Sequence, residues 1–288
     1  MPDTLMAPPE AASVNPYLPR RARLVSVRRM VPDNHLFTFR FLDSGDVEAF
    51  WHRPGQFVML SLAGVGEAPI SISSSPSRPG VLELCVRRVG RLTGALYQLA
   101  TNAVVGIRGP YGNGFPIDRI EGHDLLIAAG GLGMAPLRSL LWWTLDHRDR
   151  YGRVTLMYGA RQPETMLFRD ELVSLTGRPD LDCLLTVDED PGGQWSGHIG
   201  LLPSLFDHAR IEPSRTFAAV CGPPVVFHII LEKLLDLGFT KDRILMSLER
   251  RMKCGVGKCG HCSVGYRYTC VHGPIFTYWD AINLPELV

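Results

Sequence analysis

Four cysteines near the end of this sequence constrain its fold more than any other feature. They are Cys254, Cys259, Cys262 and Cys270, spaced C-x4-C-x2-C-x7-C. The first three reproduce the plant-type iron–sulfur run, in which a short loop wraps thiolates around a binuclear iron core. Glycines such as Gly255 allow positive φ and let backbone N–H groups approach sulfur. The pattern predicts a 2Fe-2S cluster, which carries one electron at a time.

Four thiolates are also a ligand set for tetrahedral zinc, so a structural zinc site is the alternative interpretation. Zinc ribbons usually pair two C-x2-C knuckles, whereas this run contains one, at Cys259 and Cys262. No carboxylate lies between Cys254 and Cys270, and Arg and Lys residues accompany the run, which suits an anionic cluster. His261 lies within the run, but four cysteines complete a ligand set, so we expect it to hydrogen-bond or face solvent.

Length and composition are typical of a soluble protein with two domains and an added cysteine segment. The chain has 288 residues, of which 45% are hydrophobic, and a net charge of +1. This charge lacks the basic excess expected of a nucleic-acid-binding protein. Glycines and Pro136 interrupt the apolar segment 125–145, so we expect no membrane span. Residues 1–18 lack an apolar signal core and are predicted to be an N-terminal extension. The cysteines outside the run are single and scattered, which predicts a reducing, cytoplasmic compartment.

Residues 19–118 predict an antiparallel β-barrel. Short runs of β-branched and aromatic residues are separated by turn residues such as Pro54-Gly55 and Pro79-Gly80. The expected strands cover residues 23–27, 35–40, 56–62, 68–73, 81–87 and 104–108, and a short helix covers 93–100.

Residues 119–248 predict a doubly wound parallel sheet, because strand and helix patterns alternate there. The expected strands are 125–129, 154–158, 181–187 and 216–221, and the expected helices are 137–147, 167–176, 201–209 and 225–237. A surface loop is expected at 188–197. Residues 249–288 form the predicted cluster-binding domain.

The glycine loop after the first of these strands indicates a nucleotide site. Gly130, Gly131 and Gly133 let the backbone approach a pyrophosphate at a helix N-terminus. A tight packing turn is the alternative, because the loop departs from G-x-G-x-x-G. Cys221-Gly222-Pro223 ends a later strand of the same sheet, where carboxyl ends converge on a ligand crevice.

From about Pro19 the chain resembles the ferredoxin-NADP reductase superfamily. Residues 66–76 and 249–262 look most like the gamma subunit of cytoplasmic NAD(P)-linked nickel-iron hydrogenases, the sulfhydrogenases. Close relatives are the electron-transfer subunits of anaerobic sulfite reductase and of dihydroorotate dehydrogenase. The resemblance implies FAD in the barrel, NAD or NADP as substrate on the sheet, and a 2Fe-2S cluster held by the four cysteines. It also implies a hetero-oligomer with hydrogenase iron–sulfur, small and large subunits.

The resemblance implies roles for the flavin-binding residues. The family motif R-x-Y-S/T falls on residues 68–71, where its arginine and tyrosine are absent. Pro69, Ile70 and Ser71 are expected beside the flavin, and Arg87 is expected to replace the missing cation. The family's G-x-x-S/T motif falls on Gly90 to Thr93, and these two residues are expected to receive the pyrophosphate.

It also implies roles for the nucleotide-binding residues. Gly130, Gly131 and Gly133 match the pyridine-nucleotide loop, and Cys221, Gly222 and Pro223 match the motif beside the nicotinamide. Arg161 follows the second strand of the sheet, where it would meet the 2′-phosphate of NADP or simply face solvent, so NAD versus NADP stays open.

The chemistry implied is hydride transfer between nicotinamide and flavin, followed by single-electron transfer through the cluster. Because the cofactors supply this chemistry, no catalytic side chain is expected, and Ser71 and Cys221 are the residues expected nearest the two rings. The expected function is a diaphorase subunit of a hydrogenase. One alternative changes the partner to dihydroorotate dehydrogenase or sulfite reductase. Another is a regulatory or scaffold module that binds a nucleotide and holds zinc.

Overall fold

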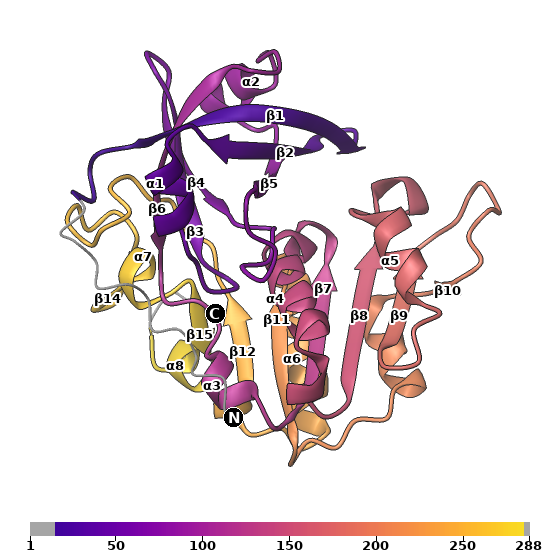
Figure 1. Ribbon diagram of the computed structural model, residues 1–288. Coiled ribbons are helices and arrows are strands. Elements are labelled where there is room, and N and C mark those ends of the chain that lie inside the picture. Colours follow the sequence, from indigo (N-terminus) through magenta and orange to yellow (C-terminus); the bar gives the residue numbers. More distant parts are fainter. Residues whose placement is uncertain (1–14, 285–288) are drawn as a thin grey trace.

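The computed structural model describes residues 15–284 and contains two large sheets and one small one. Figure 1 shows one sheet at the top and the other below it, with the C-terminal segment in yellow beside both. Most of the predicted N-terminal extension, residues 1–14, lies outside the described residues. Among residues 15–284, every helix is too short or too polar to cross a membrane.

The first sheet is the predicted barrel. Its strands are β1 (Arg20–Val31), β2 (Asn34–Phe41), β3 (Phe57–Leu62), β4 (Gly66–Ser71), β5 (Leu82–Arg87) and β6 (Val104–Tyr111). Their order is β4-β3-β6-β1-β2-β5, and all paired neighbours are antiparallel. A bridge between Ile72 and Leu84 joins the end of β4 to β5 and closes the barrel. The barrel encloses fully buried side chains, including Leu24, Phe37 and Phe39.

Two short helices flank this barrel. The helix α1 (Ser44–Ala49) was not predicted, because none of its residues is buried and it therefore has no apolar periodicity. Asp43 caps its N-terminus through bonds from the N–H groups of Gly45 and Asp46. The helix α2 (Arg91–Leu96) begins two residues before the predicted start at residue 93 and ends four residues before the predicted end at residue 100.

The second sheet confirms the predicted α/β fold class. Its strands are β7 (Asp124–Gly130), β8 (Val154–Ala160), β9 (Asp182–Val187), β10 (His198–Ile199), β11 (Thr216–Cys221), β12 (Ile244–Ser247) and β15 (Ile275–Thr277). Their order is β10-β9-β8-β7-β11-β12-β15, and all pairs are parallel except β12 with β15. The short strands β10, β12 and β15 are absent from the prediction.

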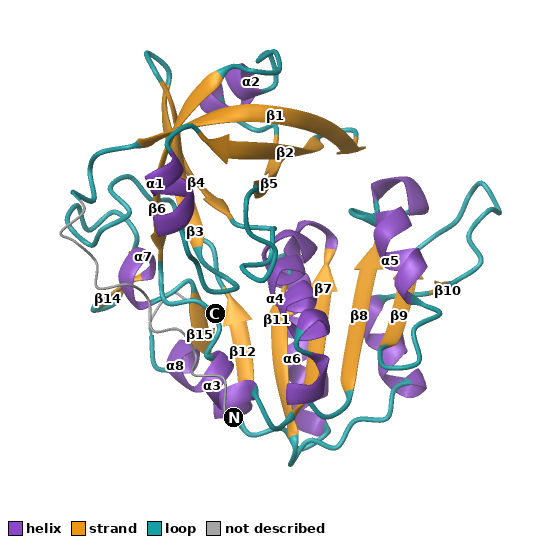
Figure 2. Ribbon diagram, in the orientation of Figure 1, coloured by secondary structure: helices purple, strands orange, loops and turns teal. Residues whose placement is uncertain are grey.

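Helices cover both faces of this sheet (Figure 2). They are α3 (Ile117–Ile120), α4 (Met134–Asp146), α5 (Arg169–Leu175) and α6 (Pro224–Asp236). Alternate residues of β7 divide between two cores: Leu125 and Ile127 pack with α4 and α5, whereas Leu126 packs with α6. Residues 201–209, predicted as an α-helix, instead contain a 3₁₀ helix at Leu202–His208. The glycine loop is shorter than expected, because α4 begins at Met134.

The C-terminal segment is attached to both sheets. It contains β13 (Ser263–Val264), β14 (Arg267–Tyr268), α7 (Thr269–His272) and α8 (Tyr278–Ile282), and it supplies β15 as the antiparallel edge of the second sheet. Beyond β6, Asn113 donates through its side-chain amide to the carbonyls of His272 and Ile275, at 2.9 and 2.7 Å. The loop of residues 254–262, called here the cysteine loop, is therefore held between the barrel and the α/β sheet.

Candidate functional site

Two cavities lie side by side at the carboxyl ends of β7 and β11. The barrel cavity has a volume of about 240 Å³ and is bounded by β4, β5 and the start of α4. The sheet cavity has a volume of about 550 Å³ and is bounded by the ends of β11 and β12 and the start of α6. Both are lined by Arg87, Leu132, Ser247, Leu248, Glu249 and Arg250. Ligands in the two cavities would therefore lie next to each other.

Most of the predicted cofactor-binding residues line these cavities. Those in the barrel cavity are Pro69, Ile70, Ser71, Arg87 and Thr93. Those in the sheet cavity are Arg87, Gly133, Cys221, Gly222 and Pro223. Gly90, Gly130 and Gly131 line neither cavity: Gly90 and Gly131 lie in the adjoining turns, and Gly130 ends β7. Arg161 is 80% exposed beyond the end of β8, and its Nε lies 3.5 Å from the Glu189 carboxylate.

Sequence reasoning missed the shared wall formed by residues 247–250. Ser247 ends β12 and residues 248–250 follow it; because β12 is parallel to β11, the chain direction brings them to the same crevice. The available signal was the apolar run Ile244–Ser247, all of which is buried. The neighbouring cysteine run masked this signal, because residues 249–262 were assigned together to the cluster segment.

The glycine loop packs tightly against the end of β11. Gly131 has φ +51°, and a side chain there would meet no atom within 4 Å. A Cβ on Gly133 would instead overlap the backbone carbonyl of Cys221, so the two segments require glycine at that position. The buried Tyr158 hydroxyl fixes the turn by donating to the carbonyl of Gly131 at 3.0 Å. The loop is thus both a close-packed turn and one boundary of the sheet cavity.

Two cysteines at the cavities are neutral thiols. Burial raises the pKa of Cys221 to about 12, and its Sγ lies 3.6 Å from the carbonyl oxygen of Ser247. Burial likewise raises the pKa of Cys85, which lines the barrel cavity, to about 12. Because the thiolate is the nucleophilic form of cysteine, neither residue is prepared for covalent catalysis.

The turn before α2 is organised by Thr93. Its hydroxyl oxygen accepts the N–H groups of Val89 at 3.0 Å and Gly90 at 2.9 Å. These bonds hold the turn next to Arg87. The backbone of the turn therefore stays at the edge of the barrel cavity. The side chain of Arg87 is exposed, as a residue that meets a bound anion would need to be.

Backbone N–H groups in the cysteine loop point at two of the sulfurs. The Cys254 sulfur accepts from Val256, Lys258 and Cys259 at 3.5, 3.3 and 3.4 Å. The Cys270 sulfur accepts from Gly257 at 3.2 Å. Gly255, Gly257 and Gly260 all have positive φ, between 71° and 76°, as the sequence predicted. The loop therefore supplies hydrogen bonds to sulfur of the kind that tune a bound iron–sulfur cluster.

These contacts favour the thiolate form of Cys254. Burial by itself would raise the pKa of the Cys254 thiol, but the N–H groups pointing at its sulfur lower the pKa to about 6. Thiolate is the form that ligates metal, so the loop fits a cluster. Within residues 15–284, no group of three or more His, Cys, Asp or Glu side chains is gathered as ligands of a single metal ion. The fit to a cluster therefore lies in the backbone geometry of the loop and in the thiolate at Cys254.

The cysteine loop has an inner and an outer side. Cys262 and Cys270 are buried against Phe57 and Met59 of β3, and Met252 packs on the same group. Phe57 and Met252 also line the barrel cavity, so these two side chains lie between the cavity and the buried cysteines. Cys259, by contrast, is exposed.

Three protein families match successive parts of the chain. The oxidoreductase FAD-binding domain matches residues 21–115, and the oxidoreductase NAD-binding domain matches residues 126–231. The iron–sulfur cluster binding domain of dihydroorotate dehydrogenase B matches residues 249–281. The barrel cavity thus lies in a FAD-binding domain, the sheet cavity in an NAD-binding domain, and the four cysteines in an iron–sulfur domain.

Known proteins resemble the chain over most or all of its length. Sulfhydrogenase 2 subunit gamma of Pyrococcus furiosus is 43% identical, covering 96% of this chain and 100% of the relative. Sulfhydrogenase 1 subunit gamma of the same organism is 42% identical, covering 100% and 99%. A probable dihydroorotate dehydrogenase B (NAD(+)) electron transfer subunit of Pyrococcus abyssi is 35% identical over 78% of each chain.

A solved structure shares the fold. A chain of the NADH-dependent reduced ferredoxin-NADP oxidoreductase structure superposes with a TM-score of 0.70 at 23% identity, covering 90% of this chain and 88% of the other. That likeness shows the architecture, whereas the full-length matches to the gamma subunits show the family. The chain belongs to the family of sulfhydrogenase gamma subunits, electron-transfer oxidoreductase subunits that join FAD-binding, NAD-binding and iron–sulfur domains.

Proposed function

We propose that the chain is the diaphorase subunit of a nickel-iron hydrogenase, passing hydride between NAD(P)(H) and FAD and single electrons through a 2Fe-2S cluster. One observation carries the proposal. The barrel cavity shares a wall with the sheet cavity on one side and reaches the buried cysteines through Phe57 and Met252 on the other. This order of sites matches the order in which electrons would pass.

The residues of the sheet cavity would hold the pyridine nucleotide. Gly130, Gly131 and Gly133 let the backbone and the start of α4 approach the pyrophosphate. The segment Cys221–Pro223 would lie beside the nicotinamide, with the neutral Cys221 thiol providing a non-ionised surface. Arg161 would contact the adenosine ribose. It already forms an ion pair with Glu189, so we propose either NAD or NADP as the substrate.

The residues of the barrel cavity would hold FAD. Pro69, Ile70 and Ser71 lie on β4 and would line the ring, while Arg87 and the turn from Gly90 to Thr93 would receive the pyrophosphate. When bound, FAD exchanges a hydride with nicotinamide and single electrons with an iron–sulfur centre. The protein's contribution is to hold the rings in contact at the shared wall and to exclude water there.

Cys254, Cys259, Cys262 and Cys270 would ligate the cluster. The plant-type spacing of the first three favours the 2Fe-2S type. The exposed side at Cys259 gives electrons an outlet, and exposed Lys253 and Lys258 flank it. None of the seven cysteines forms a disulfide within residues 15–284, and the cytoplasmic location is part of the proposal, because thiolates that ligate a cluster suit a reducing compartment.

The proposed partners are the iron–sulfur, small and large subunits of a hydrogenase. The support is sequence identity. The chain is 43% identical to a sulfhydrogenase gamma subunit over the full length of that subunit, and 35% identical to a probable dihydroorotate dehydrogenase electron transfer subunit over 78% of that subunit. The match of residues 249–281 to the dihydroorotate dehydrogenase B cluster domain keeps that enzyme as the second candidate. Affinity purification from the native host distinguishes them, because each proposal names a different co-purifying enzyme.

A cysteine substitution tests the electron outlet. Cys259→Ser should abolish or strongly perturb the visible and paramagnetic signals of the cluster while flavin-dependent reduction of an artificial dye by NAD(P)H continues. Cys183→Ser is the matched control, since Cys183 lies on β9, outside the cysteine run, and should leave both properties unchanged. An unaltered cluster in Cys259→Ser contradicts the ligand assignment, and colourless wild-type protein containing zinc contradicts the proposed function.

A further inference from the structure

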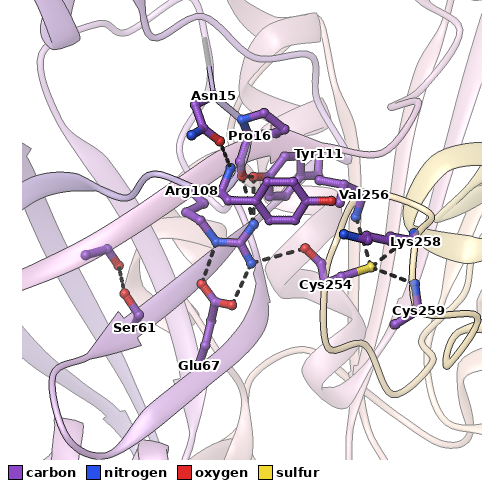
Figure 3. A network of polar contacts seen from close by, with 12 residues as sticks. Asn15, Pro16, Ser61, Glu67, Arg108, Tyr111, Cys254, Val256, Lys258 and Cys259 are labelled. Atoms are coloured by element: carbon purple, nitrogen blue, oxygen red, sulfur yellow. Dashed lines mark hydrogen bonds and ion pairs between the residues drawn. The ribbon is translucent and has the colours of Figure 1, made fainter.

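Arg108 lies at the centre of a polar network that reaches the cysteine loop. It is on β6, is 6% exposed, and forms a bidentate ion pair with Glu67 of β4, with Nε donating to Oε1 at 2.7 Å and Nη2 donating to Oε2. Its Nη2 also donates to the backbone carbonyl of Cys254 at 3.1 Å. In Figure 3, the guanidinium lies between the Glu67 carboxylate and Cys254.

The other guanidinium nitrogen of Arg108 binds the segment before β1 and Tyr111. Its Nη1 donates to the carbonyl of Pro16 at 2.8 Å and to the hydroxyl of Tyr111 at 3.1 Å. The Tyr111 hydroxyl itself donates to the Pro16 carbonyl. One buried side chain thus joins two barrel strands, the segment before β1 and the first residue of the cysteine run.

The carbonyl oxygen and the sulfur of Cys254 have different hydrogen-bond partners. The carbonyl of Cys254 is held by Arg108, while its sulfur accepts N–H groups from Val256, Lys258 and Cys259. A shift of the carbonyl would rotate the backbone on which this sulfur is mounted. Arg108 therefore holds the backbone of Cys254 from the barrel side.

The same contact brings a permanent charge to the loop. A guanidinium stays protonated at any physiological pH, so Arg108 carries its positive charge throughout. Glu67 accepts from Nε and Nη2 of the guanidinium, and its side chain is 25% exposed. Reduction adds negative charge to a cluster, so a nearby buried cation favours the reduced form and a nearby carboxylate opposes it.

We propose that the Arg108–Glu67 ion pair tunes the reduction potential of the cluster by its charges, with the Arg108 guanidinium held at the loop by its hydrogen bond to the Cys254 carbonyl. The inference rests on the proposed function, since it requires a cluster at the four cysteines. It concerns a pair of residues outside the cysteine run, and it predicts effects of opposite sign for its two members.

The two charge-neutralising substitutions have different consequences. Arg108→Gln removes the cation and should lower the midpoint potential of the cluster. Glu67→Gln removes the opposing carboxylate, leaves Arg108 uncompensated, and should raise that potential. Arg108→Lys keeps the charge and should stay closer to the wild-type potential than Arg108→Gln does. A purely structural role would shift Arg108→Gln and Glu67→Gln in the same direction, since each breaks the same bidentate pair.

The test is a redox titration of the anaerobically purified full-length chain, reduced stepwise with dithionite and followed by electron paramagnetic resonance. The FAD midpoint, followed by visible absorbance in the same samples, is the internal reference and should stay constant. Tyr111→Phe is the matched control, because it removes one neutral hydrogen bond to Arg108 and leaves both charges in place.

Opposite shifts for Arg108→Gln and Glu67→Gln, with the Tyr111→Phe potential near wild type, would support the proposal. Shifts of equal sign, or no shift in either variant, would overturn it. If Arg108→Gln fails to hold a cluster, Glu67→Gln still decides the matter: an unchanged or lowered potential contradicts the proposal. Absence of a cluster signal from the wild-type protein is a different result, because it removes the proposed function itself.

Discussion

Gly133 is the residue at which the glycine loop tolerates least change. A Cβ there would overlap the backbone carbonyl of Cys221, and a backbone atom cannot swing aside as a side chain can. We expect Gly133→Ala to destabilise the protein by about 3 kcal/mol, as overpacking does, and to raise the KM for NAD(P)H. Urea unfolding and steady-state dye reduction measure the two effects.

Gly131→Ala is the matched control for that substitution. Its φ of +51° makes an alanine strained by about 1 kcal/mol, but the added methyl group meets no atom within 4 Å. The loss of stability should therefore be smaller than for Gly133→Ala. Equal losses in the two variants would show that close packing against Cys221 is not what requires glycine in this loop.

At the scale of elements, the segment before β3 carries a buried histidine that makes stability depend on pH. His52 is 5% exposed, and burial lowers its pKa from 6.5 to about 4, with a contact to the Arg53 carbonyl at 3.3 Å opposing the shift. The unfolded chain therefore binds a proton at His52 more readily than the folded chain. Stability from this residue is complete above pH 6.5 and is lost as the pH falls towards 4, by about 3 kcal/mol in total.

Substitution of His52 should remove that dependence. The free energy of unfolding of His52→Gln should change less between pH 6.5 and 4.5 than that of the wild type, when both are measured by urea unfolding. His208→Gln, at an exposed position of the 3₁₀ helix, should retain the wild-type pH profile. A profile for His52→Gln that overlays the wild type would show that His52 is not the group responsible.

The elements predicted from the sequence are those whose buried residues form a recognisable apolar pattern along the chain. The strand predicted at 216–221 coincides with β11, because all of its residues are buried. In contrast, α1 buries no residue, and the three-residue β15 is too short for a pattern to emerge. Residues 201–209 have helical composition, but the chain forms a 3₁₀ helix opened by the Leu202-Pro203 turn.

The same distinction applies to the site. Motifs with a fixed local spacing, such as the cysteine run and the glycine loop, could be found in the sequence because their geometry is local. The wall at residues 247–250 could not, because it depends on β12 lying beside β11. The Arg108 network likewise joins residues 41 and 146 positions apart, a pairing that no local pattern indicates.

At the scale of the whole molecule, one buried arginine fixes the barrel against the α/β sheet. Arg138 on α4 is 7% exposed and pairs with Glu83 of β5 at 2.7 Å and with Glu171 of α5 at 2.7 Å. It also donates to the carbonyl of Ser73 at 2.9 Å. The barrel cavity and the sheet cavity lie at this interface between the two parts. The ion pairs of Arg138 therefore fix the position of one cavity relative to the other.

Removal of Arg138 should therefore affect both stability and hydride transfer. Arg138→Ala leaves two largely buried carboxylates without their partner, which costs about 3 kcal/mol, and it should slow flavin reduction by NAD(P)H in stopped-flow absorbance. Arg78→Ala is the matched control, since Arg78 joins Asp146 of α4 at 2.8 Å but is 47% exposed. That pair should contribute about 1 kcal/mol or less. An equal slowing in the two variants would contradict a special role for Arg138.

We propose that electrons pass within this single chain from the sheet cavity to the barrel cavity and then to the cysteine loop. The first step would transfer two electrons as a hydride, and the second would transfer them one at a time. Anaerobic electron paramagnetic resonance of the full-length protein, reduced first with NAD(P)H and then with dithionite, tests that order most directly. We predict flavin bleaching by NAD(P)H and the low-temperature signal of a reduced binuclear iron–sulfur cluster, lost in Cys259→Ser. Flavin bleaching without a cluster signal from either reductant would contradict it.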